Sequence, residues 1–299
     1  MRRLDLVAAG RTLALGERPW LMGIVNASPD SFSQAGADAG LESCVARASE
    51  LLAAGADIVD VGGESAITQR PPVSVGEEIE RVVPLVERLA GELAATVSVD
   101  TYKPVVARAA IAAGAAIVND VSGLRDPELA DVCAATGAGL VIMHTRAAPK
   151  QRLQDRGLYD EDGVAANVAS FLAERIELAR QHGVAEQQIV LDPGPDFAKT
   201  PAQTIALLRS LDELHALGRP LLLAVSRKDF IGALTGRRPA QRLAGTLAAL
   251  GHGVDAGAHI LRVHDVAAAA DFLAVRAALC GEAAVDGSLG LDDALRHER

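Results

Sequence analysis

Carboxylate and amide side chains end several short apolar segments of this 299-residue chain. They are Asp60, Glu64, Asp100, Asn119, Asp120 and Asp192. Such groups offer paired hydrogen-bond donors and acceptors, which suit the edge of a planar nitrogen heterocycle. Asp100 and Asp192 interrupt strongly apolar segments at the same depth, which favours a functional role for both. A magnesium site is the competing interpretation, because Asp100, Asn119 and Asp192 carry oxygen ligands that Mg²⁺ accepts.

Cationic side chains end the last two apolar segments, as Arg227 with Lys228 and as Arg262 with His264. The chain has a formal net charge of −10, so cations gathered in one place predict an anionic ligand there. Ordinary solvated charge is the alternative for these residues. We expect Lys228 to donate hydrogen bonds or to shuttle a proton, with a structural ion pair as its alternative role. The acidic balance and the lack of a basic stripe argue against nucleic acid as a partner.

The position of these groups along the chain predicts the fold. Eight short apolar segments alternate with helix-like patterns, and each segment ends on a polar residue. The ends lie near Asn26, Glu64, Asp100, Asn119, His144, Asp192, Arg227 and Arg262. Buried parallel strands have this pattern, and a (β/α)8 barrel builds its active site at the C-terminal ends of all eight strands. We therefore predict an α/β fold, a TIM barrel with phosphate-binding loops after its seventh and eighth strands.

The barrel is expected to occupy residues 20–280. Residues 1–19 are expected to form a β-hairpin that plugs its N-terminal end, and residues 281–299 a peripheral tail with a short helix at 291–297. Two capping boxes, Ser74-x-x-Glu77 and Thr200-x-x-Gln203, predict helix starts. Asp265 likewise precedes a helical pattern and is expected to cap it.

Loops and cysteines add expectations about the site and the compartment. The long polar loops 65–73 and 145–162 follow the second and fifth strands and are candidates for substrate loops, although an ordinary surface loop is the alternative for the second. Cys44, Cys133 and Cys280 stand far apart, and we expect buried or half-buried reduced thiols in a cytoplasmic protein. No apolar segment approaches the length of a membrane helix, so no membrane partner is expected.

A set of motifs falls in order on the eight predicted strands. They are MGIVNASPDSFS (22–33), DVGGES (60–65), SVDTYKPVVARAA (98–110), IVNDVSG (117–123), VIMH (141–144), LDPG with a following F.KT (191–200), SRKDFIG (226–232) and RVHDV (262–266). With these motifs, the sequence resembles the dihydropteroate synthases of folate biosynthesis from about residue 20 to residue 280. The resemblance implies a transferase that condenses 6-hydroxymethyl-7,8-dihydropterin pyrophosphate with p-aminobenzoate and releases pyrophosphate.

The resemblance also implies roles for individual residues. Those expected to be catalytic are Asp100, Lys228 and Arg262. Those expected to hold the pterin are Asp100, Asn119, Met143, Asp192 and Lys228. Those expected at the pyrophosphate are Asn26, Arg262 and His264, with a Mg²⁺ cofactor at Asn26. Those expected at p-aminobenzoate are Phe197, Ser226, Arg227 and Arg70. A homodimer is implied through outer helices near the C-terminus.

Two departures from the family pattern leave an alternative open. Residues 66–69 replace a Thr-Arg-Pro-Gly segment, with Arg70 the nearby arginine, and Asp196 replaces a glycine. Losing an arginine and gaining a carboxylate both disfavour an anion in that pocket. The alternative is a divergent paralogue that binds pterin but has weak or altered activity or a regulatory role. Pterin-dependent methyl transfer is a third hypothesis, which residues 226–228 and 262–264 do not support.

Overall fold

Eight parallel strands form a barrel in the computed structural model, which describes residues 1–27, 37–64, 71–155, 157–159, 163–292 and 295–296. The strands are β3 (Trp20–Asn26), β4 (Ile58–Gly62), β5 (Val97–Asp100), β6 (Ile117–Asp120), β7 (Gly139–Met143), β8 (Ile189–Asp192), β9 (Leu222–Leu223) and β10 (Ile260–Val263). They pair in the order β8-β7-β6-β5-β4-β3-β10-β9. A parallel bridge between Leu191 and Leu221 joins the two ends of this order. The predicted (β/α)8 barrel is therefore confirmed.

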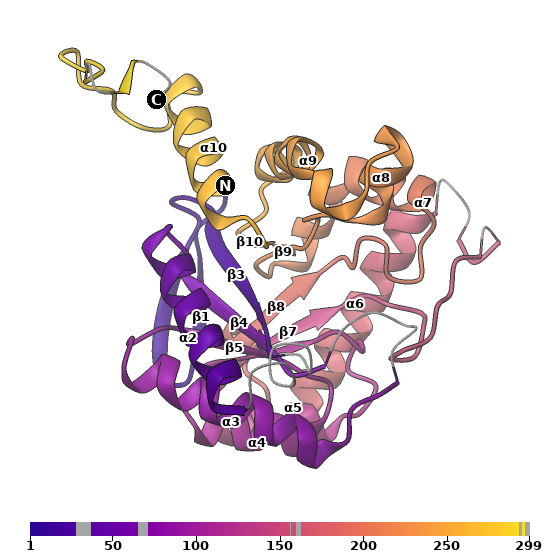
Figure 1. Ribbon diagram of the computed structural model, residues 1–299. Coiled ribbons are helices and arrows are strands. Elements are labelled where there is room, and N and C mark those ends of the chain that lie inside the picture. Colours follow the sequence, from indigo (N-terminus) through magenta and orange to yellow (C-terminus); the bar gives the residue numbers. More distant parts are fainter. Residues whose placement is uncertain (28–36, 65–70, 156, 160–162, 293–294, 297–299) are drawn as a thin grey trace.

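Helices lie outside the strands (Figure 1). They are α2 (Ala37–Ala53), α3 (Val75–Gly91), α4 (Pro104–Ala112), α5 (Glu128–Thr136), α6 (Val164–Gln181), α7 (Pro201–Arg209), α8 (Asp229–Thr235), α9 (Leu243–Asp255) and α10 (Val266–Leu279), with short 3₁₀ segments at Glu186–Gln188, Leu211–Leu217 and Pro239–Gln241. Both predicted capping boxes are present, one at Ser74 before α3 and one at Thr200 before α7. Each satisfies backbone N–H groups that a helix start leaves unpaired.

The predicted N-terminal hairpin is also confirmed, as β1 (Leu4–Ala8) paired antiparallel with β2 (Arg11–Leu15). Its Leu6 and Leu15 share an apolar cluster with barrel residues such as Met22, Ile58 and Ile117. The hairpin therefore closes the N-terminal end of the barrel interior.

A change from apolar to polar side chains inside the barrel positions the site. Successive strand residues point to opposite faces, so residues two apart share a face. The apolar cluster includes Ile58, Ile117 and Ile260. The side chains two positions further along the same strands are Asp60, Asn119 and Arg262. The neighbouring residues in each strand, such as Val59 and Val61, instead pack outward in the larger cluster with the helices. An apolar floor thus supports a polar layer at the C-terminal mouth.

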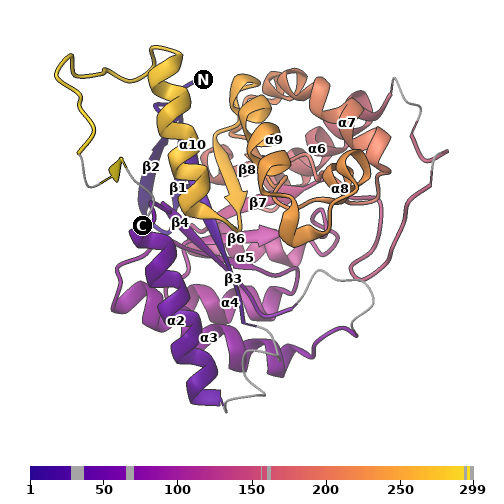
Figure 2. The ribbon, with the colours of Figure 1, turned by 45° about the horizontal axis from the view of Figure 1, so that its top comes forward.

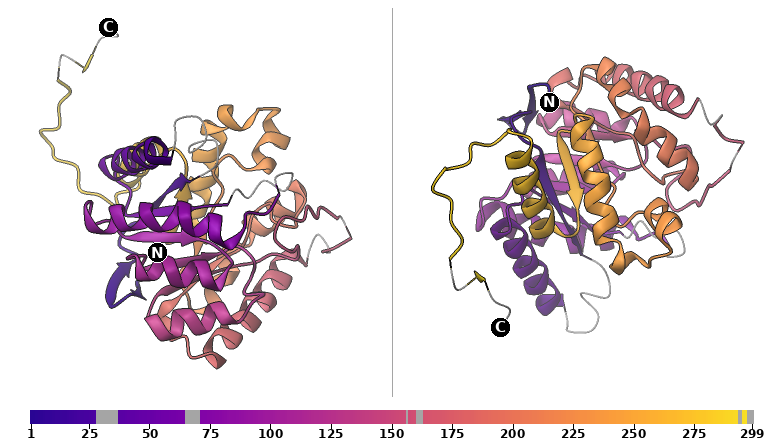
Figure 3. Two further views of the ribbon diagram at one scale, coloured as in Figure 1. Left: turned by 60° about the horizontal axis from the view of Figure 1, so that its bottom comes forward. Right: turned by 90° about the horizontal axis from the view of Figure 1, so that it is seen from above.

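The C-terminal tail leaves the barrel, as Figures 2 and 3 show. Residues 281–292 are exposed, and the described part of 291–297, residues 291–292 and 295–296, has a single 3₁₀ residue at Leu295, whose N–H donates to the Asp292 carbonyl. Cys44 and Cys133 are buried as expected, but the expectation for Cys280 was wrong. Its thiol is exposed because it follows the last residue of α10, where the chain leaves the barrel. Among the described residues, none forms a helix long and apolar enough to cross a membrane.

Candidate active site

A cavity of about 430 Å³ opens at the C-terminal mouth of the barrel. Asp100 and Thr101 line it from the end of β5, and Asp196 and Phe197 line it from the turn after β8. The segment 147–154 after β7 covers another side. The described part of the predicted substrate loop 145–162 therefore borders the cavity. Arg70 and the altered positions 66–69 lie outside the described residues.

Arg262 joins two carboxylates at the base of this mouth. Its Nε donates to Asp60 Oδ2 at 2.6 Å, and its Nη2 donates to Asp100 Oδ2 at 2.7 Å. Burial works against the charged guanidinium, but the two carboxylates outweigh it and raise the pKa of Arg262. Three different strands, β4, β5 and β10, carry these side chains, so the barrel itself fixes their separation.

Asp60 and Asn119 have free acceptor atoms beneath the mouth. Asn119 Nδ2 donates to Asp60 Oδ2 at 3.2 Å, and both residues are buried. Asp60 Oδ1 and Asn119 Oδ1 have no hydrogen-bond partner among the described residues. A buried acceptor without a partner is costly, so these two atoms point to a ligand with N–H donors or to bound water. The sequence placed Asp60 among the strand-end groups suited to the edge of a heterocycle, but the resemblance assigned it no specific role.

Asp100 has an unusual proton affinity. Burial is the main cause that raises its pKa to about 7; Arg262 opposes the shift, and the negative charge of Asp60 reinforces it. Asp192, on β8, is buried, and its Oδ1 accepts a hydrogen bond from the Gly194 N–H at 2.7 Å. Burial also raises the pKa of Asp192. Met143 pairs with Asp192 across β7 and β8 and is buried beside it.

Lys228 and Phe197 meet although they come from different turns. The Lys228 Nζ lies 4.1 Å from the centroid of the Phe197 ring, a cation–π contact. Burial lowers the pKa of Lys228, and the nearby carboxylates of Asp196 and Asp192 limit that shift. The predicted ring-binding lysine and the predicted aminobenzoate-side aromatic are thus neighbours.

Arg227 is held in place by Asp265. Its Nε and Nη2 donate to the two carboxylate oxygens of Asp265 at 3.1 and 2.7 Å, a bidentate pair. Asp265 does occupy the N-cap position of α10, but its side chain makes no capping bond there. The expected cap was therefore wrong, because the guanidinium competes for both oxygens. Arg227 also has a left-handed backbone, with φ of 60°.

Ser226 and His264, predicted on opposite sides of the site, bond to each other. The Ser226 hydroxyl lies 2.9 Å from His264 Nδ1 and accepts the His264 backbone N–H at 3.2 Å. Burial, aided by the nearby charges of Arg227 and Arg262, lowers the pKa of His264 to about 4. A neutral imidazole that accepts from Ser226 at Nδ1 carries its proton on Nε2. That N–H is a donor suited to an anionic oxygen.

Asn26 ends β3 and is exposed at the mouth. Its Oδ1 lies beside Gly62 and close to Asp100. A Cβ atom added to Gly62 would lie 3.8 Å from Asn26 Oδ1 and 3.6 Å from the Asp100 Cβ. The described residues contain no group of three or more His, Cys, Asp or Glu side chains able to hold a metal ion. Because Mg²⁺ usually keeps several waters and binds substrate phosphates, one amide oxygen at this position suits a cation held mainly by a ligand.

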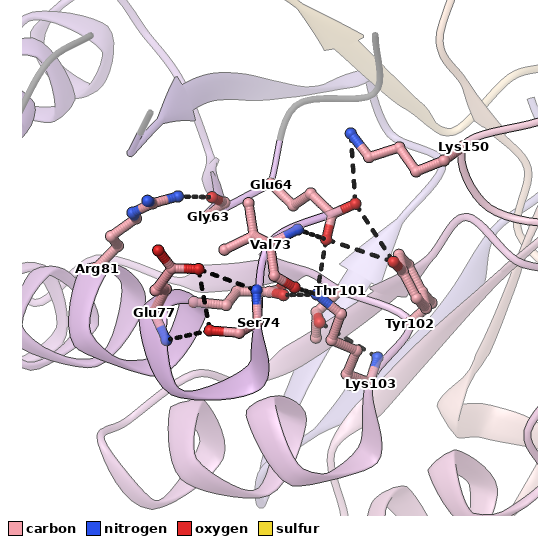
Figure 4. A network of polar contacts seen from close by, with 11 residues as sticks. Gly63, Glu64, Val73, Ser74, Glu77, Arg81, Thr101, Tyr102, Lys103 and Lys150 are labelled. Carbon is pink, nitrogen blue, oxygen red and sulfur yellow. Dashed lines mark hydrogen bonds and ion pairs between the residues drawn. The ribbon is translucent and has the colours of Figure 1, made fainter. Parts of the chain in front are cut away.

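A polar network joins three loops around the cavity (Figure 4). Glu64 lies between two lysines, with Lys103 Nζ at 2.6 Å from its Oε2 and Lys150 Nζ at 3.3 Å from its Oε1. Lys103 also bonds Glu78 Oε2 at 2.6 Å and the Val73 carbonyl at 2.7 Å. Burial disfavours the Glu64 carboxylate, but Lys103 outweighs it and lowers the pKa of Glu64. The network connects the loop after β4 to the loop after β7.

Sequence reasoning missed a buried lysine beneath the turn after β8. Lys199 is fully buried, and its Nζ donates to the carbonyls of Gly194 and Phe197 at 2.9 and 3.1 Å. It also lies 2.8 Å from His144 Nδ1. Burial lowers the pKa of Lys199 to about 7, and burial keeps His144 neutral by lowering its pKa far below its usual value. The F.KT motif was the signal in the sequence, but spacing gave no hint of burial.

The fold and the site define a class: a barrel enzyme whose mouth offers acceptors to a flat heterocycle and cations to an anion. Residues 22–264 match the family model described as pterin binding enzyme. The dihydropteroate synthase of Synechocystis is 42% identical over 266 residues, covering 88% of this chain and 91% of that protein. The Escherichia coli dihydropteroate synthase is 41% identical over 263 residues, covering 88% and 92%.

Solved structures that are similar to this chain are also dihydropteroate synthases. A dihydropteroate synthase of Xanthomonas albilineans with 4-aminobenzoic acid has a TM-score of 0.84 at 44% identity, covering 93% of this chain and 99% of that one. The same enzyme with 7,8-dihydropteroate has a TM-score of 0.80 at 43% identity, covering 93% and 99%. The chain belongs to the dihydropteroate synthases within the pterin binding enzymes. The comparisons do not favour the alternative of a paralogue with altered activity.

Proposed function

We propose that this chain condenses 6-hydroxymethyl-7,8-dihydropterin pyrophosphate with p-aminobenzoate to give 7,8-dihydropteroate and pyrophosphate. The observation that carries the proposal is the polar layer at the barrel mouth, in which Arg262 joins Asp60 and Asp100 and two buried acceptor atoms have no partner in the described part of the chain. Dihydropteroate synthase structures that are 44% and 43% identical to this chain contain 4-aminobenzoic acid and 7,8-dihydropteroate, respectively.

The pterin ring is assigned to this polar layer. Asp60 Oδ1 and Asn119 Oδ1 would accept from ring N–H and amino groups, which removes the cost of leaving them unpaired. Asp192 and the Lys228 ammonium would complete the edge of the ring, and Met143 would pack against it. The site is expected to discriminate strongly between the pterin and heterocycles without these N–H donors, because such a heterocycle leaves the buried acceptors unsatisfied.

The pyrophosphate is assigned to the cationic side of the mouth. When the C–O bond to pyrophosphate breaks, negative charge develops on the leaving oxygen and positive charge on the pterin. Arg262 and the Nε2–H of His264 would stabilise the first, and the carboxylates of Asp60 and Asp100 the second. The arylamine nitrogen forms the new C–N bond and then loses a proton, and since it is neutral it attacks without a strong base.

Magnesium is proposed as the cofactor, with Asn26 as its protein ligand. Asn26 is exposed, and its amide oxygen lies at the same mouth as Asp100. A bound Mg²⁺ would neutralise charge on the phosphates and make pyrophosphate a better leaving group.

The aminobenzoate is assigned to the side of the cavity formed by Phe197, Lys228 and the Ser226–Arg227 turn. Phe197 lines the cavity, and the cations of Lys228 and Arg227 suit a carboxylate. Arg70 is proposed as a further contact, from a loop outside the described residues.

A homodimer and a cytoplasmic location complete the proposal. The outer face of α9 and α10 exposes Leu243, Val275 and Leu279, which favours association of two chains there. The three free cysteines fit a reducing compartment. Sedimentation equilibrium tests the dimer, and a Leu279→Glu variant is expected to be monomeric if the face is the interface.

The activity is tested by incubating the purified chain with both substrates and Mg²⁺. We expect pyrophosphate and dihydropteroate in equal amounts, and no product when either substrate is left out. A chain that binds the pterin in calorimetry but forms no product at high enzyme concentration would overturn the assignment and favour the paralogue alternative.

A further inference from the structure

Asp196 occupies a demanding position in the turn after β8. Its backbone is left-handed, with φ of 65°, a conformation that costs a residue with a Cβ more than it costs glycine. The sequence resemblance led us to expect a glycine here, and it suggested that a carboxylate would repel an anion in the pocket. The contacts of this side chain point to a different role.

Both carboxylate oxygens of Asp196 are used within the protein. Oδ2 accepts from the backbone N–H groups of Asp229 at 2.5 Å and Phe230 at 3.3 Å, the first two residues of α8. Oδ1 accepts from the hydroxyl of Thr204 at 3.0 Å, and the Asp196 N–H donates back to that hydroxyl oxygen at 3.0 Å. Thr204 is fully buried in α7. One side chain thus ties the turn after β8 to two helices.

The bonds to α8 replace a missing local cap. The N-cap residue of α8 is Lys228, whose side chain makes no capping hydrogen bond. A carboxylate at a helix start satisfies unpaired N–H groups and interacts favourably with the helix dipole. Asp196 supplies this from another loop, so its negative charge is already met by protein donors and does not face the pocket unpaired.

The cap also fixes two functional groups relative to each other. Phe197 directly follows Asp196, and Lys228 directly precedes the N–H groups that Asp196 accepts from. The ammonium of Lys228 sits 4.1 Å from the Phe197 ring centroid. Other side chains hold each turn separately, such as Lys199 at the Phe197 carbonyl and Arg242 at the Lys228 carbonyl, whereas Asp196 links the one turn to the other.

We propose that Asp196 is a positioning residue, which caps α8 from the neighbouring loop and thereby holds Phe197 against Lys228 on the aminobenzoate side of the site. The inference rests on the proposed function only in assigning that side to the arylamine. The capping itself is independent of any activity.

The first test measures the cap directly. Hydrogen exchange at the Asp229 and Phe230 amides should speed up about fivefold in Asp196→Ala, the size expected for loss of one cap, and return toward wild type in Asp196→Asn, which keeps an acceptor. Asp126→Ala is the matched control, since Asp126 Oδ1 accepts from the Glu128 N–H at the start of α5, away from this side. Unchanged exchange in Asp196→Ala would overturn the proposal, whether or not the chain proves to be active.

The second test uses kinetics. In Asp196→Ala the KM for p-aminobenzoate should rise about fivefold while the Kd for the pterin pyrophosphate stays within about twofold, with partial rescue in Asp196→Asn. Asp126→Ala should leave both constants unchanged. A lower KM in Asp196→Ala or Asp196→Gly would mean that charge repulsion dominates and would overturn the proposal. If the wild-type chain forms no dihydropteroate, the proposed function fails while the exchange experiment still decides the cap.

Discussion

The two sides of the barrel mouth are built in different ways. The side assigned to the pterin is built mainly from strand residues, Asp60, Asp100, Asn119 and Asp192, whose positions follow from the pairing of parallel strands, and Lys228 joins it from the turn after β9. The side assigned to p-aminobenzoate consists of turns after β8 and β9. Those turns are held by side-chain links, such as Arg227 to Asp265 and Lys199 to Gly194.

This difference predicts how each side responds to mutation. A strand side chain keeps its position when a neighbour changes, because the backbone ladder supports it, so mutations there act through charge and desolvation. A turn residue depends on its links, so removing one link shifts the groups that the turn carries. Rigid elements hold functional groups more precisely than loops unless second contacts support the loops.

The largest effect is expected at Arg262. Arg262→Met leaves the buried carboxylates of Asp60 and Asp100 without their cation and removes a stabiliser of the leaving pyrophosphate. We expect kcat to fall by about 10³-fold and the free energy of unfolding to fall by about 3 kcal/mol. Steady-state kinetics and chemical denaturation measure the two effects.

A double variant separates the effect on kcat from the effect on the free energy of unfolding. Asp60→Asn combined with Arg262→Met removes one of the stranded charges, so stability should partly recover while kcat stays low. If activity recovered together with stability, Arg262 would be acting on the fold alone, and its role at the pyrophosphate would be contradicted.

Most of the strand side could be predicted from the sequence. The apolar segments, each ending on a polar residue, indicate parallel strands, and the rule that such strands end at one mouth brings Asp100, Asn119, Asp192 and Arg262 together. The two-residue periodicity within each strand also distinguishes Asn119, which faces inward, from its neighbour Asp120. The Asp120 carboxylate instead accepts the backbone N–H groups of Ser122 and Leu124 and fixes the following loop.

The turn side could not be predicted in the same way. The partners of Asp196 lie 8 and 33 or more residues away, and no periodicity relates them. For that reason the sequence suggested that Asp196 repels an anion, while the structure shows it bonded to α7 and α8. Arg227 and Asp265, 38 residues apart, illustrate the same point. Side-chain links between loops depend on the packed geometry of turns, which local patterns do not encode.

Lys199 offers a pH-dependent test of the turn side. Its pKa of about 7 in the folded chain lies below its ordinary value, so between these two pH values the unfolded chain binds more protons. Stability should therefore rise with pH above about 7, by up to about 1.4 kcal/mol per pH unit from this one group. In Lys199→Met that contribution to the slope should vanish. Denaturation from pH 7 to pH 10 compares the slopes, and equal slopes would show that burial does not lower the pKa of Lys199.

A smaller effect is expected at Glu64, which links two loops. Glu64→Gln weakens its bonds to Lys103 and Lys150 and should loosen the segment 145–155, at a cost of about 1 kcal/mol. Trypsin cleaves after Lys150 and Arg152, so its cleavage rate in this segment reports the loosening. Glu78→Gln is the matched control, since it weakens Lys103 but leaves the Glu64–Lys150 pair intact. Equal cleavage in both variants would contradict a specific link between the loops.

The smallest effect is expected at Asp265, because both partners of its ion pair are about one third exposed. Asp265→Asn keeps one acceptor for Arg227 but loses the bidentate geometry and the charge. We expect the KM for p-aminobenzoate to rise about two- to threefold, in line with a partly solvated pair, and pterin binding to stay unchanged. Kinetics at low and high salt check whether the ion pair is the origin of the KM change, since salt screens the pair and the rise in KM should be larger at low salt. If pterin binding changed as much as the KM, the two sides of the mouth would be coupled, and the distinction between strand-built and turn-built halves would not hold.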